Sequence, residues 1–213
     1  MNLILFGAPG SGKGTQAQVL SEKLHLEKIS LGDIFREEVK NNSSLGKEVK
    51  QYMEKGLLVP DDLVSRIIEV HVNNKNFILD GYPRNINQVK TLEEILKRKN
   101  QAIDWFIYLE VDDKTIIERL SQRRICKKCG ANYHLKNMPP HKSNICDKCG
   151  SELIQRKDDF PDVIKKRCEV FLKETKGILK YYKEREKLIT VDARGNKDEI
   201  FARIKEKMPW PAH

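Results

Sequence analysis

The N-terminal segment places a glycine-rich turn between a short apolar strand and a helical pattern. The apolar run spans Leu3 to Phe6, and the turn Gly7-Ala-Pro-Gly-Ser-Gly-Lys-Gly-Thr15 follows it directly. Glycines let the backbone curl so that successive N–H groups converge on one concavity, and the start of the next helix adds partial positive charge. We therefore predict a loop that holds the phosphates of a nucleotide. The residues expected to form it are Gly10, Ser11, Gly12, Lys13, Gly14 and Thr15.

One position departs from the general pattern of such loops. Gly14 stands where Ser or Thr would follow the lysine, and the hydroxyl arrives one residue later, at Thr15, which we expect on the metal-bound side. The alternative is an ordinary glycine-rich turn between a strand and a helix. The order of strand, glycines, lysine and helix favours the phosphate loop.

Composition limits the class of protein. A chain of 213 residues is long enough for one well-packed domain with insertions, and its 39% hydrophobic and 33% charged residues are typical of a globular protein. No apolar run approaches the roughly 20 residues that span a bilayer, and the first strand begins at once, so we expect a cytoplasmic protein with no leader and no membrane partner.

The formal net charge of +9 raises the question of nucleic-acid binding. The lysines are mixed with glutamates, as in segments 90–99 and 173–187, which is typical of solvated helix faces. Metal-bound cysteine thiolates would lower the charge further. We therefore expect no nucleic-acid partner, and the chain is expected to be a monomer.

Apolar strand-like runs alternate with long helical patterns. The runs are Leu3–Phe6, Lys28–Ser30, Phe77–Asp80, Trp105–Val111 and Leu188–Val191, and the first helix is expected near Lys13–Leu24. This alternation predicts an α/β fold whose parallel sheet has helices on both faces. In such sheets the ligand binds beyond the carboxyl ends of the strands, where the glycine loop, Asp33 and segment 80–84 all fall.

Two stretches interrupt the alternation and are predicted to be insertions in one core. Residues 30–60 are largely helical in pattern and end at a hinge, Gly56 to Pro60, before a helix that Asp61 is expected to cap. Residues 123–159 are rich in Cys, Asn, Pro and Gly. The core is then made of residues 1–29, 61–122 and 160–213.

The second insertion carries two Cys-x-x-Cys-Gly turns separated by sixteen residues. Each turn can offer two sulfurs to one face, and four thiolates complete a closed tetrahedron, so Cys126, Cys129, Cys146 and Cys149 predict structural zinc. Two disulfides or redox dithiols are the alternative, which a cytoplasmic setting disfavours. Cys168, on a long helix near Val170, is expected to be a small buried side chain.

Together the loop and the two insertions resemble the adenylate kinases, specifically the long bacterial type with a zinc-bearing lid, over essentially the whole chain. The resemblance implies a P-loop NTPase-like core with a helical NMP-binding insertion and a zinc-ribbon lid. Its motifs are Gly7–Thr15, Ile29-Ser-Leu-Gly-Asp-Ile-Phe-Arg36, Asp80-Gly-Tyr-Pro-Arg84, Arg123, Gln155-Arg-Lys-Asp-Asp159 and Arg167.

The activity implied is reversible phosphoryl transfer from MgATP to AMP, giving two ADP. An attacking phosphate oxygen is already ionised at neutral pH, so catalysis needs positioning and charge neutralisation rather than a general base. The resemblance implies that Lys13, Arg84, Arg123, Arg156 and Arg167 act on the phosphates, and that Asp33 and Asp80 orient waters around Mg²⁺. Asp158 and Asp159 are expected to hold the lid arginines, or to act as charges at a helix N-terminus.

The resemblance also assigns the base sites. On the ATP side it implies Arg119 stacked on the adenine, with Gly195, Asn132 and Tyr133 in contact with the nucleotide. His134 is expected to pack or form hydrogen bonds in the lid rather than act as an acid or a metal ligand. The acceptor side is implied to comprise Leu31, Arg36, Leu57, Leu58, Val59, Gly81, Tyr82, Pro83, Arg84, Gln88, Arg156 and Arg167. Residues 31–60 are expected to fold over AMP and residues 123–159 over ATP.

Leu31 is a departure from the family, which usually has threonine there with its hydroxyl toward the acceptor base. Either Gln88 and backbone groups suffice for adenine, or the choice of acceptor is altered toward CMP, UMP or GMP. One neutral hydrogen bond contributes only about 0.5 to 1.5 kcal/mol, so AMP is retained as the expected acceptor. A nucleic-acid-binding P-loop protein with a zinc ribbon is a further alternative, which the lack of stacking aromatics beyond Tyr133 disfavours.

Overall fold

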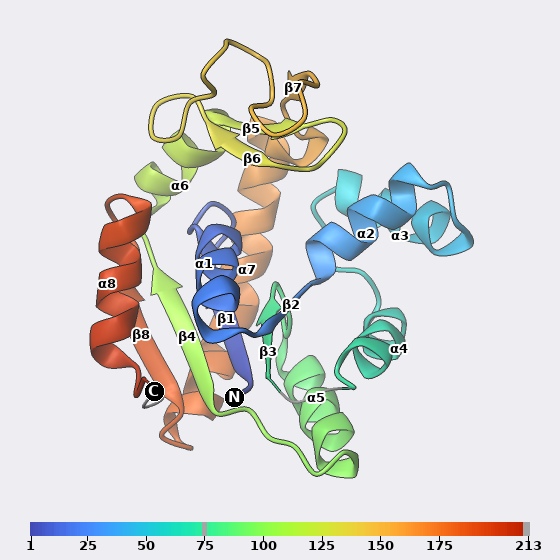
Figure 1. Ribbon diagram of the computed structural model, residues 1–213. Helices are drawn as coiled ribbons and strands as arrows, with labels where there is room; N and C mark the ends of the chain where they lie inside the picture. The colour runs from blue at the N-terminus through green and yellow to red at the C-terminus, as the bar shows by residue number, and fades with distance from the viewer. Residues whose placement is uncertain (74–75, 211–213) are drawn as a thin grey trace.

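The computed structural model describes residues 1–73 and 76–210, and its centre is a five-stranded parallel sheet (Figure 1). The strand order is β2-β3-β1-β4-β8. Because neighbouring strands are parallel, the chain crosses over between them through helical connections. The strands are β1 (Leu3–Gly7), β2 (Glu27–Ser30), β3 (Phe77–Asp80), β4 (Trp105–Glu110) and β8 (Leu188–Asp192). The predicted α/β fold is confirmed, and each strand lies within one or two residues of its expected bounds.

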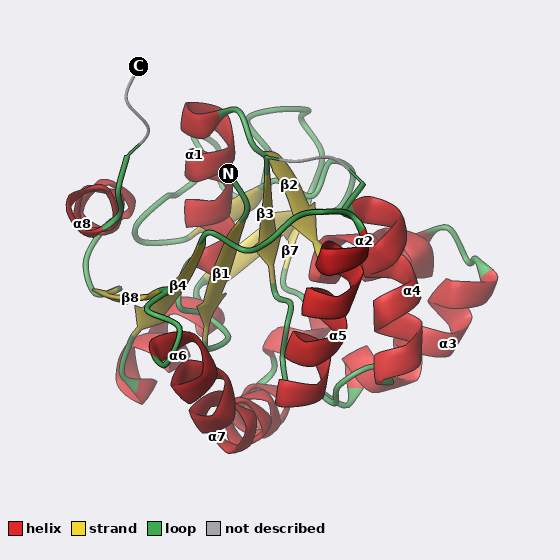
Figure 2. Ribbon diagram, turned by 90° about the horizontal axis from the view of Figure 1, so that it is seen from below, coloured by secondary structure: helices red, strands yellow, loops and turns green. Residues whose placement is uncertain are grey.

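The central strand β1 shows why both faces of the sheet are covered. Ile4 and Phe6 pack into the hydrophobic cluster that includes α5 (Ile86–Arg98) and α7 (Pro161–Lys183). Leu3 and Leu5, pointing the opposite way, pack against α1 (Lys13–Leu24) and α8 (Lys197–Lys207). Each such side chain contributes about 1.5 to 3 kcal/mol by leaving water, which anchors the sheet between two helical layers. Figure 2 shows helices on both faces of the sheet.

The first insertion is a helical pair, α2 (Leu31–Lys40) and α3 (Ser44–Glu54), followed by α4 (Asp61–His71). The Ser43 side chain caps α3 by accepting a hydrogen bond from the Gly46 N–H at 2.9 Å. The prediction that Asp61 caps α4 is wrong. Pro60 is the N-cap residue and makes no side-chain cap, whereas Asp61 is the first helical residue and its carboxylate contacts α5.

The second insertion lies beyond the carboxyl end of β4, after α6 (Asp113–Ser121) (Figure 1). It contains a three-stranded antiparallel sheet of β5 (Arg123–Cys126), β6 (Asn132–His134) and β7 (Leu153–Ile154), in the order β6-β5-β7. The one-turn helix η1 (Lys157–Asp159) then leads into α7. The cluster of buried hydrophobic side chains in this small sheet comprises only Cys126, Tyr133, Cys146 and Leu153, which is little core for a segment of its length.

The burial of Cys168 and the character of the helices complete the description of the fold. Cys168 is half-buried rather than buried, at the edge of a cluster formed by Ile116, Leu120 and Ile164. Among the described residues, no helix combines the length and the apolar character that crossing a membrane would need.

The contact of α3 with α2 predicts opposite effects for two glycine substitutions. A Cβ at Gly46 would lie 2.1 Å from the Glu38 carbonyl oxygen, so Gly46→Ala should lower the free energy of unfolding by about 1 to 3 kcal/mol. At Gly177, inside α7, the nearest atom would be 3.9 Å away, so Gly177→Ala should raise it by up to about 1 kcal/mol. Urea unfolding of both variants checks this, and equal effects would contradict the α2–α3 packing.

Candidate functional site

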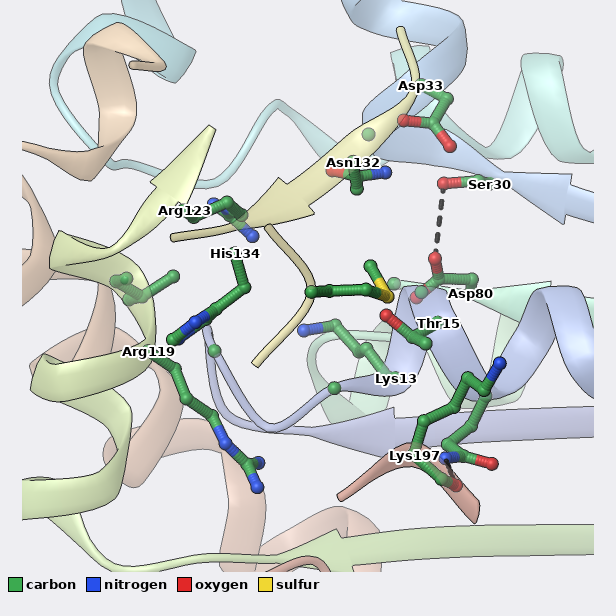
Figure 3. A pocket seen from close by; sticks show the side chains of 18 of the residues that line it. Lys13, Thr15, Ser30, Asp33, Asp80, Arg119, Arg123, Asn132, His134 and Lys197 are labelled. Atoms are coloured by element: carbon green, nitrogen blue, oxygen red, sulfur yellow. Dashed lines mark hydrogen bonds between the residues drawn. The ribbon is translucent and has the colours of Figure 1, made fainter. Parts of the chain in front are cut away.

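The main cleft lies at the carboxyl ends of the strands and has a volume of about 240 Å³. Its walls come from the glycine loop, the end of β3, the start of α2, the second insertion and the start of α8 (Figure 3). Segments far apart in the sequence therefore meet at the edge of the sheet where ligands bind in folds of this kind.

Backbone conformation explains the glycines of the loop. Gly10 and Gly12 have φ angles of 80° and 90°, which side chains with a Cβ rarely adopt, and Gly12 is the N-cap of α1. Lys13 begins that helix and donates from Nζ to the Ala8 carbonyl at 3.1 Å, across the mouth of the loop. Burial lowers the pKa of Lys13 to about 7, and Arg84, Arg167 and Arg123 lower it too, although Asp80 opposes them.

Gly14 has a physical reason to replace the usual hydroxyl residue. A Cβ at this position would lie 3.2 Å from Asp80 Oδ2, so the glycine lets the carboxylate at the end of β3 approach the helix closely. Asp80 is buried and accepts a hydrogen bond from the Ser30 hydroxyl at 3.3 Å (Figure 3). Thr15 lies beside it and lines the same cleft.

Two of the predicted arginines are held by carboxylates of η1. Arg123 donates to Asp159 through Nε at 2.7 Å and through Nη2 at 2.5 Å, a bidentate pair that fixes the guanidinium plane. Arg167, on α7, lies 3.1 Å from Asp158 and 3.2 Å from Asp159. The expectation that these aspartates hold lid arginines is confirmed for Asp159, which holds Arg123, whereas Asp158 pairs with Arg167 of the core helix α7.

The remaining arginines complete a cationic surface around the cleft. Arg156 donates to Asn132 Oδ1 at 2.9 Å, and Arg84 donates to the Gly81 carbonyl at 2.8 Å. Burial, together with nearby guanidinium groups, lowers the pKa of Arg84, Arg156 and Arg167, and all three remain charged at neutral pH because an arginine starts so high. Their mutual repulsion is relieved when an anion lies among them.

Arg36 and Asp33 form a pair at the entrance of α2. Arg36 Nη2 lies 2.6 Å from Asp33 Oδ1, and Lys28 lies 3.7 Å from the other oxygen. Burial would raise the pKa of Asp33, but Arg36 and Lys28 outweigh it and hold that pKa below its usual value. Asp33 is thus an anion at neutral pH, facing the cleft with Asp80 (Figure 3).

Arg119 is held as a flat platform at one end of the cleft. Its guanidinium donates to the carbonyls of Ala193 at 2.8 Å, Gly195 at 2.9 Å and Ser11 at 3.3 Å. His134 lies near it, on β6 (Figure 3). The Nδ1 atom of His134 accepts from the N–H groups of Lys136 and Asn137, which confirms its hydrogen-bonding role in the turn.

A second, smaller cavity of about 70 Å³ opens beside the first, under α2. Its wall combines apolar and charged side chains and includes Leu31, which is only 2% exposed, and Gln88, which is 3% exposed. Six other predicted acceptor residues line it as well: Arg36, Leu57, Leu58, Val59, Arg84 and Arg167. Gly81 and Pro83 line an adjoining cavity of similar size that reaches Lys13.

Some predicted residues reach the site only indirectly. The Tyr82 side chain is 1% exposed, lies in the core and donates to the Gln88 carbonyl at 3.0 Å. Ser11 is buried and contributes its carbonyl to Arg119. Other cleft residues were missed, among them Lys28, Met138 and Lys197, because isolated lysines and methionines carry no local signal.

The four predicted cysteines converge in the second insertion. Their sulfurs all lie within 4.8 Å of one another, with Cys126 and Cys149 at 3.4 Å and Cys129 and Cys146 at 3.6 Å. Tetrahedral zinc with sulfur ligands requires separations of about 3.8 Å, whereas a disulfide requires about 2.05 Å, so the sulfurs fit a metal. Tyr133 donates to the Cys146 sulfur at 3.4 Å, which connects a cleft-lining strand to the cysteine cluster.

Comparison with known proteins agrees with this geometry. The family model for adenylate kinase matches residues 5–187. The adenylate kinase of Caldanaerobacter subterraneus subsp. tengcongensis is 44% identical over 212 residues, covering 98% of this chain and 96% of that protein. The adenylate kinase of Caldicellulosiruptor saccharolyticus is 50% identical over 194 residues, covering 89% and 90%, and that of Methanocella arvoryzae is 46% identical over 209 residues, covering 96% and 97%. The chain therefore belongs to the adenylate kinase family.

Proposed function

We propose that this protein transfers a phosphoryl group reversibly between MgATP and AMP, giving two ADP, with the main cleft as donor site and the smaller cavity as acceptor site. The observation that carries this is the cationic surface between the two sites. Arg36, Arg84 and Arg167 line both the main cleft and the acceptor cavity, where two phosphate chains would meet. Lys13 lies beside Arg84 and Arg167 in the adjoining cavity next to the loop.

On the donor side, the loop amides and Lys13 hold the triphosphate, and Arg119 offers a planar face for the adenine. Its three carbonyl contacts keep the guanidinium from rotating, which lowers the entropy lost when a base stacks on it. Asn132 and Tyr133 act from β6, and Gly195 acts through its backbone.

At the centre, Arg84, Arg123, Arg156 and Arg167 neutralise the transferring group and fix its line of approach. No general base is needed, since the acceptor oxygen is already ionised at neutral pH. Bidentate guanidinium groups match phosphate oxygens in both charge and shape, which lysine does not. Arg36 and Arg84, which both line the smaller cavity, hold the acceptor phosphate.

Two metals fit the residues present. Asp33, Asp80 and Thr15 line the cleft together and would hold the hydration shell of Mg²⁺, which neutralises charge on the phosphates when bound. In the second insertion the four cysteines would hold structural zinc, with no position left for a substrate.

We propose further that residues 30–60 and 123–159 are covers that close over AMP and ATP and exclude water from the reaction. Contacts between the two insertions support this. Lys157 in η1 lies 3.2 Å from Glu54 at the end of α3, and Lys40 of α2 donates to the Lys128 carbonyl in the first cysteine turn at 3.3 Å.

A panel of acceptors tests the proposed reaction. With MgATP as donor, we expect rapid ADP formation with AMP and much slower transfer to CMP, UMP and GMP. Lys13→Ala should reduce transfer at least about a hundredfold, because a charge used in the transition state is lost. Preference for another monophosphate would assign that acceptor instead, and absence of transfer to all four would overturn the proposal.

The lowered pKa of Lys13 predicts proton uptake on nucleotide binding. A bound triphosphate favours the charged ammonium and raises this pKa above about 7, so the complex holds a proton that the free protein lacks at pH 8. Affinity for MgATP should therefore fall as pH rises above about 7. Titration calorimetry at pH 8 in two buffers of different ionisation enthalpy should show uptake of close to one proton per ATP bound. The Lys13→Met variant should take up close to none. Zero uptake by the unaltered protein would contradict the assignment.

Removing the metal should loosen the second insertion. Its few buried side chains cannot hold it alone, so chelation should expose segment 127–152 to protease and lower the unfolding midpoint by several degrees. Cys146→Ser should show the same change without chelator, whereas Cys168→Ser should not, because Cys168 lies outside the cluster. Unchanged protection and midpoint after verified metal loss would rule out a structural role for the metal.

A further inference from the structure

The amide of Gln88 has partners of opposite kind at its two ends. Its Oε1 atom accepts from the backbone N–H of Arg84 at 2.7 Å, and its Nε2 atom donates to Asp61 Oδ1 at 2.7 Å. The side chain is buried, and the same residue lines the smaller cavity.

These partners determine which end of the amide is oxygen and which is nitrogen. A backbone N–H can only donate, and a carboxylate can only accept. Turning the amide by 180° would bring two donors together at Arg84 and two acceptors together at Asp61. Gln88 is therefore fixed in one orientation by two independent contacts.

Neighbouring contacts hold the Asp61 carboxylate in place. Asn85 donates to both of its oxygens, at 3.0 and 3.2 Å, and Asn85 Oδ1 accepts from the Gln88 N–H at 2.8 Å as the N-cap of α5. The first residue of α4 is thus joined to the first turn of α5. Asp62, the next residue, has a side chain that is 77% exposed and lies 3.7 Å from Arg66.

A fixed amide presents a fixed pattern to a base. A glutamine amide has two N–H groups and two acceptor lone pairs, so one N–H and one lone pair remain after the internal contacts are made. Leu31, Leu57 and Val59 line the same cavity and have no side-chain donor or acceptor. Its other polar side chains are charged: three arginines assigned above to the phosphates, and Asp158, which is paired with Arg167 at 3.1 Å. Base discrimination by side chains in this part of the cavity then depends on the orientation of Gln88.

Adenine offers an acceptor at N1 beside a donor amino group at C6, which matches the free N–H and lone pair. Hypoxanthine and guanine have the reverse order, a donor at N1 beside an acceptor oxygen. We propose that Asp61 is a positioning residue for acceptor selection, holding Gln88 in the orientation that pairs with the adenine edge and opposes the hypoxanthine edge. This inference rests on the proposed function, and it identifies what selects the acceptor base although residue 31 lacks a hydroxyl.

The sharpest probe is a pair of acceptors that differ only at this edge. AMP and IMP have the same ribose, phosphate and ring size, so the ratio of their kcat/KM values isolates the reading of N1 and C6. We expect Asp61→Ala to lower this ratio at least about tenfold, because one of the two contacts that orient the amide is lost.

Matched variants separate positioning from stability. Asp61→Asn keeps an oxygen that can accept from Gln88 and should retain most of the ratio. Asp62→Ala removes the same charge from the same helical turn and should leave the ratio unchanged. Thermal unfolding of each variant shows whether it is folded at the assay temperature. If Asp61→Ala is unfolded, Asp61→Ser replaces it in the test. Serine keeps a hydroxyl in the first turn of the helix but is too short to reach Gln88.

The possible outcomes distinguish a failure of this inference from a failure of the proposed function. Equal losses with AMP and IMP in Asp61→Ala would overturn the inference, because a structural role lowers both alike, and would leave the proposed reaction intact. A ratio in Asp61→Asn as low as in Asp61→Ala would overturn it too. If the unaltered protein transferred nothing to AMP, the proposed function itself would fail.

Discussion

The structure is organised around positive charge gathered at the carboxyl end of the parallel sheet. Lys13 lies among Arg84, Arg123 and Arg167, and burial with their repulsion lowers its pKa to about 7. Such a group of cations is unfavourable in a folded chain unless carboxylates or a bound anion offset it. Asp80, Asp158 and Asp159 supply part of that compensation, and phosphates would supply the rest.

This electrostatic need explains how the insertions are tied to the core. Arg123 enters from β5 of the second insertion, yet its partner Asp159 stands immediately before α7 of the core. Arg167 on α7 shares the same carboxylate. One buried aspartate therefore contacts an arginine of the second insertion and an arginine of α7, which links the insertion to the core beside the cleft. A metal in the cysteine cluster would make the small sheet rigid enough to transmit that constraint.

Features that depend on residues close together in the sequence could be predicted from it. Apolar runs bounded by glycines and charges predicted all five core strands, and the spacing of the cysteines predicted their cluster. The arginines could be assigned only through family resemblance, because nothing in the segments around Arg156 or Arg167 says which residues they will meet. Contacts between distant elements were missed for the same reason. Asp61 does not cap α4; its carboxylate instead accepts a hydrogen bond from Gln88, which lies 27 residues later in the chain. Likewise, the reason for glycine at position 14 is Asp80, which is distant in the sequence and adjacent in the fold.

Leu31 illustrates how a change that looks functional can be structural as well. Its side chain packs in the same buried cluster as Phe35 and Val64, which joins the start of α2 to the core, and burial of a leucine there stabilises the fold by about 1.5 to 3 kcal/mol. A hydroxyl at this position would forgo that contact for one neutral hydrogen bond, worth about 0.5 to 1.5 kcal/mol. Replacing the hydroxyl by leucine is favourable only if another group recognises the acceptor base. The Gln88 amide is the group proposed for that recognition, and its orientation is fixed by a backbone N–H and a carboxylate, since reversing it would break two hydrogen bonds at once. Under the proposed function, packing at residue 31 and polar recognition at Gln88 are separate tasks of two residues that line one small cavity.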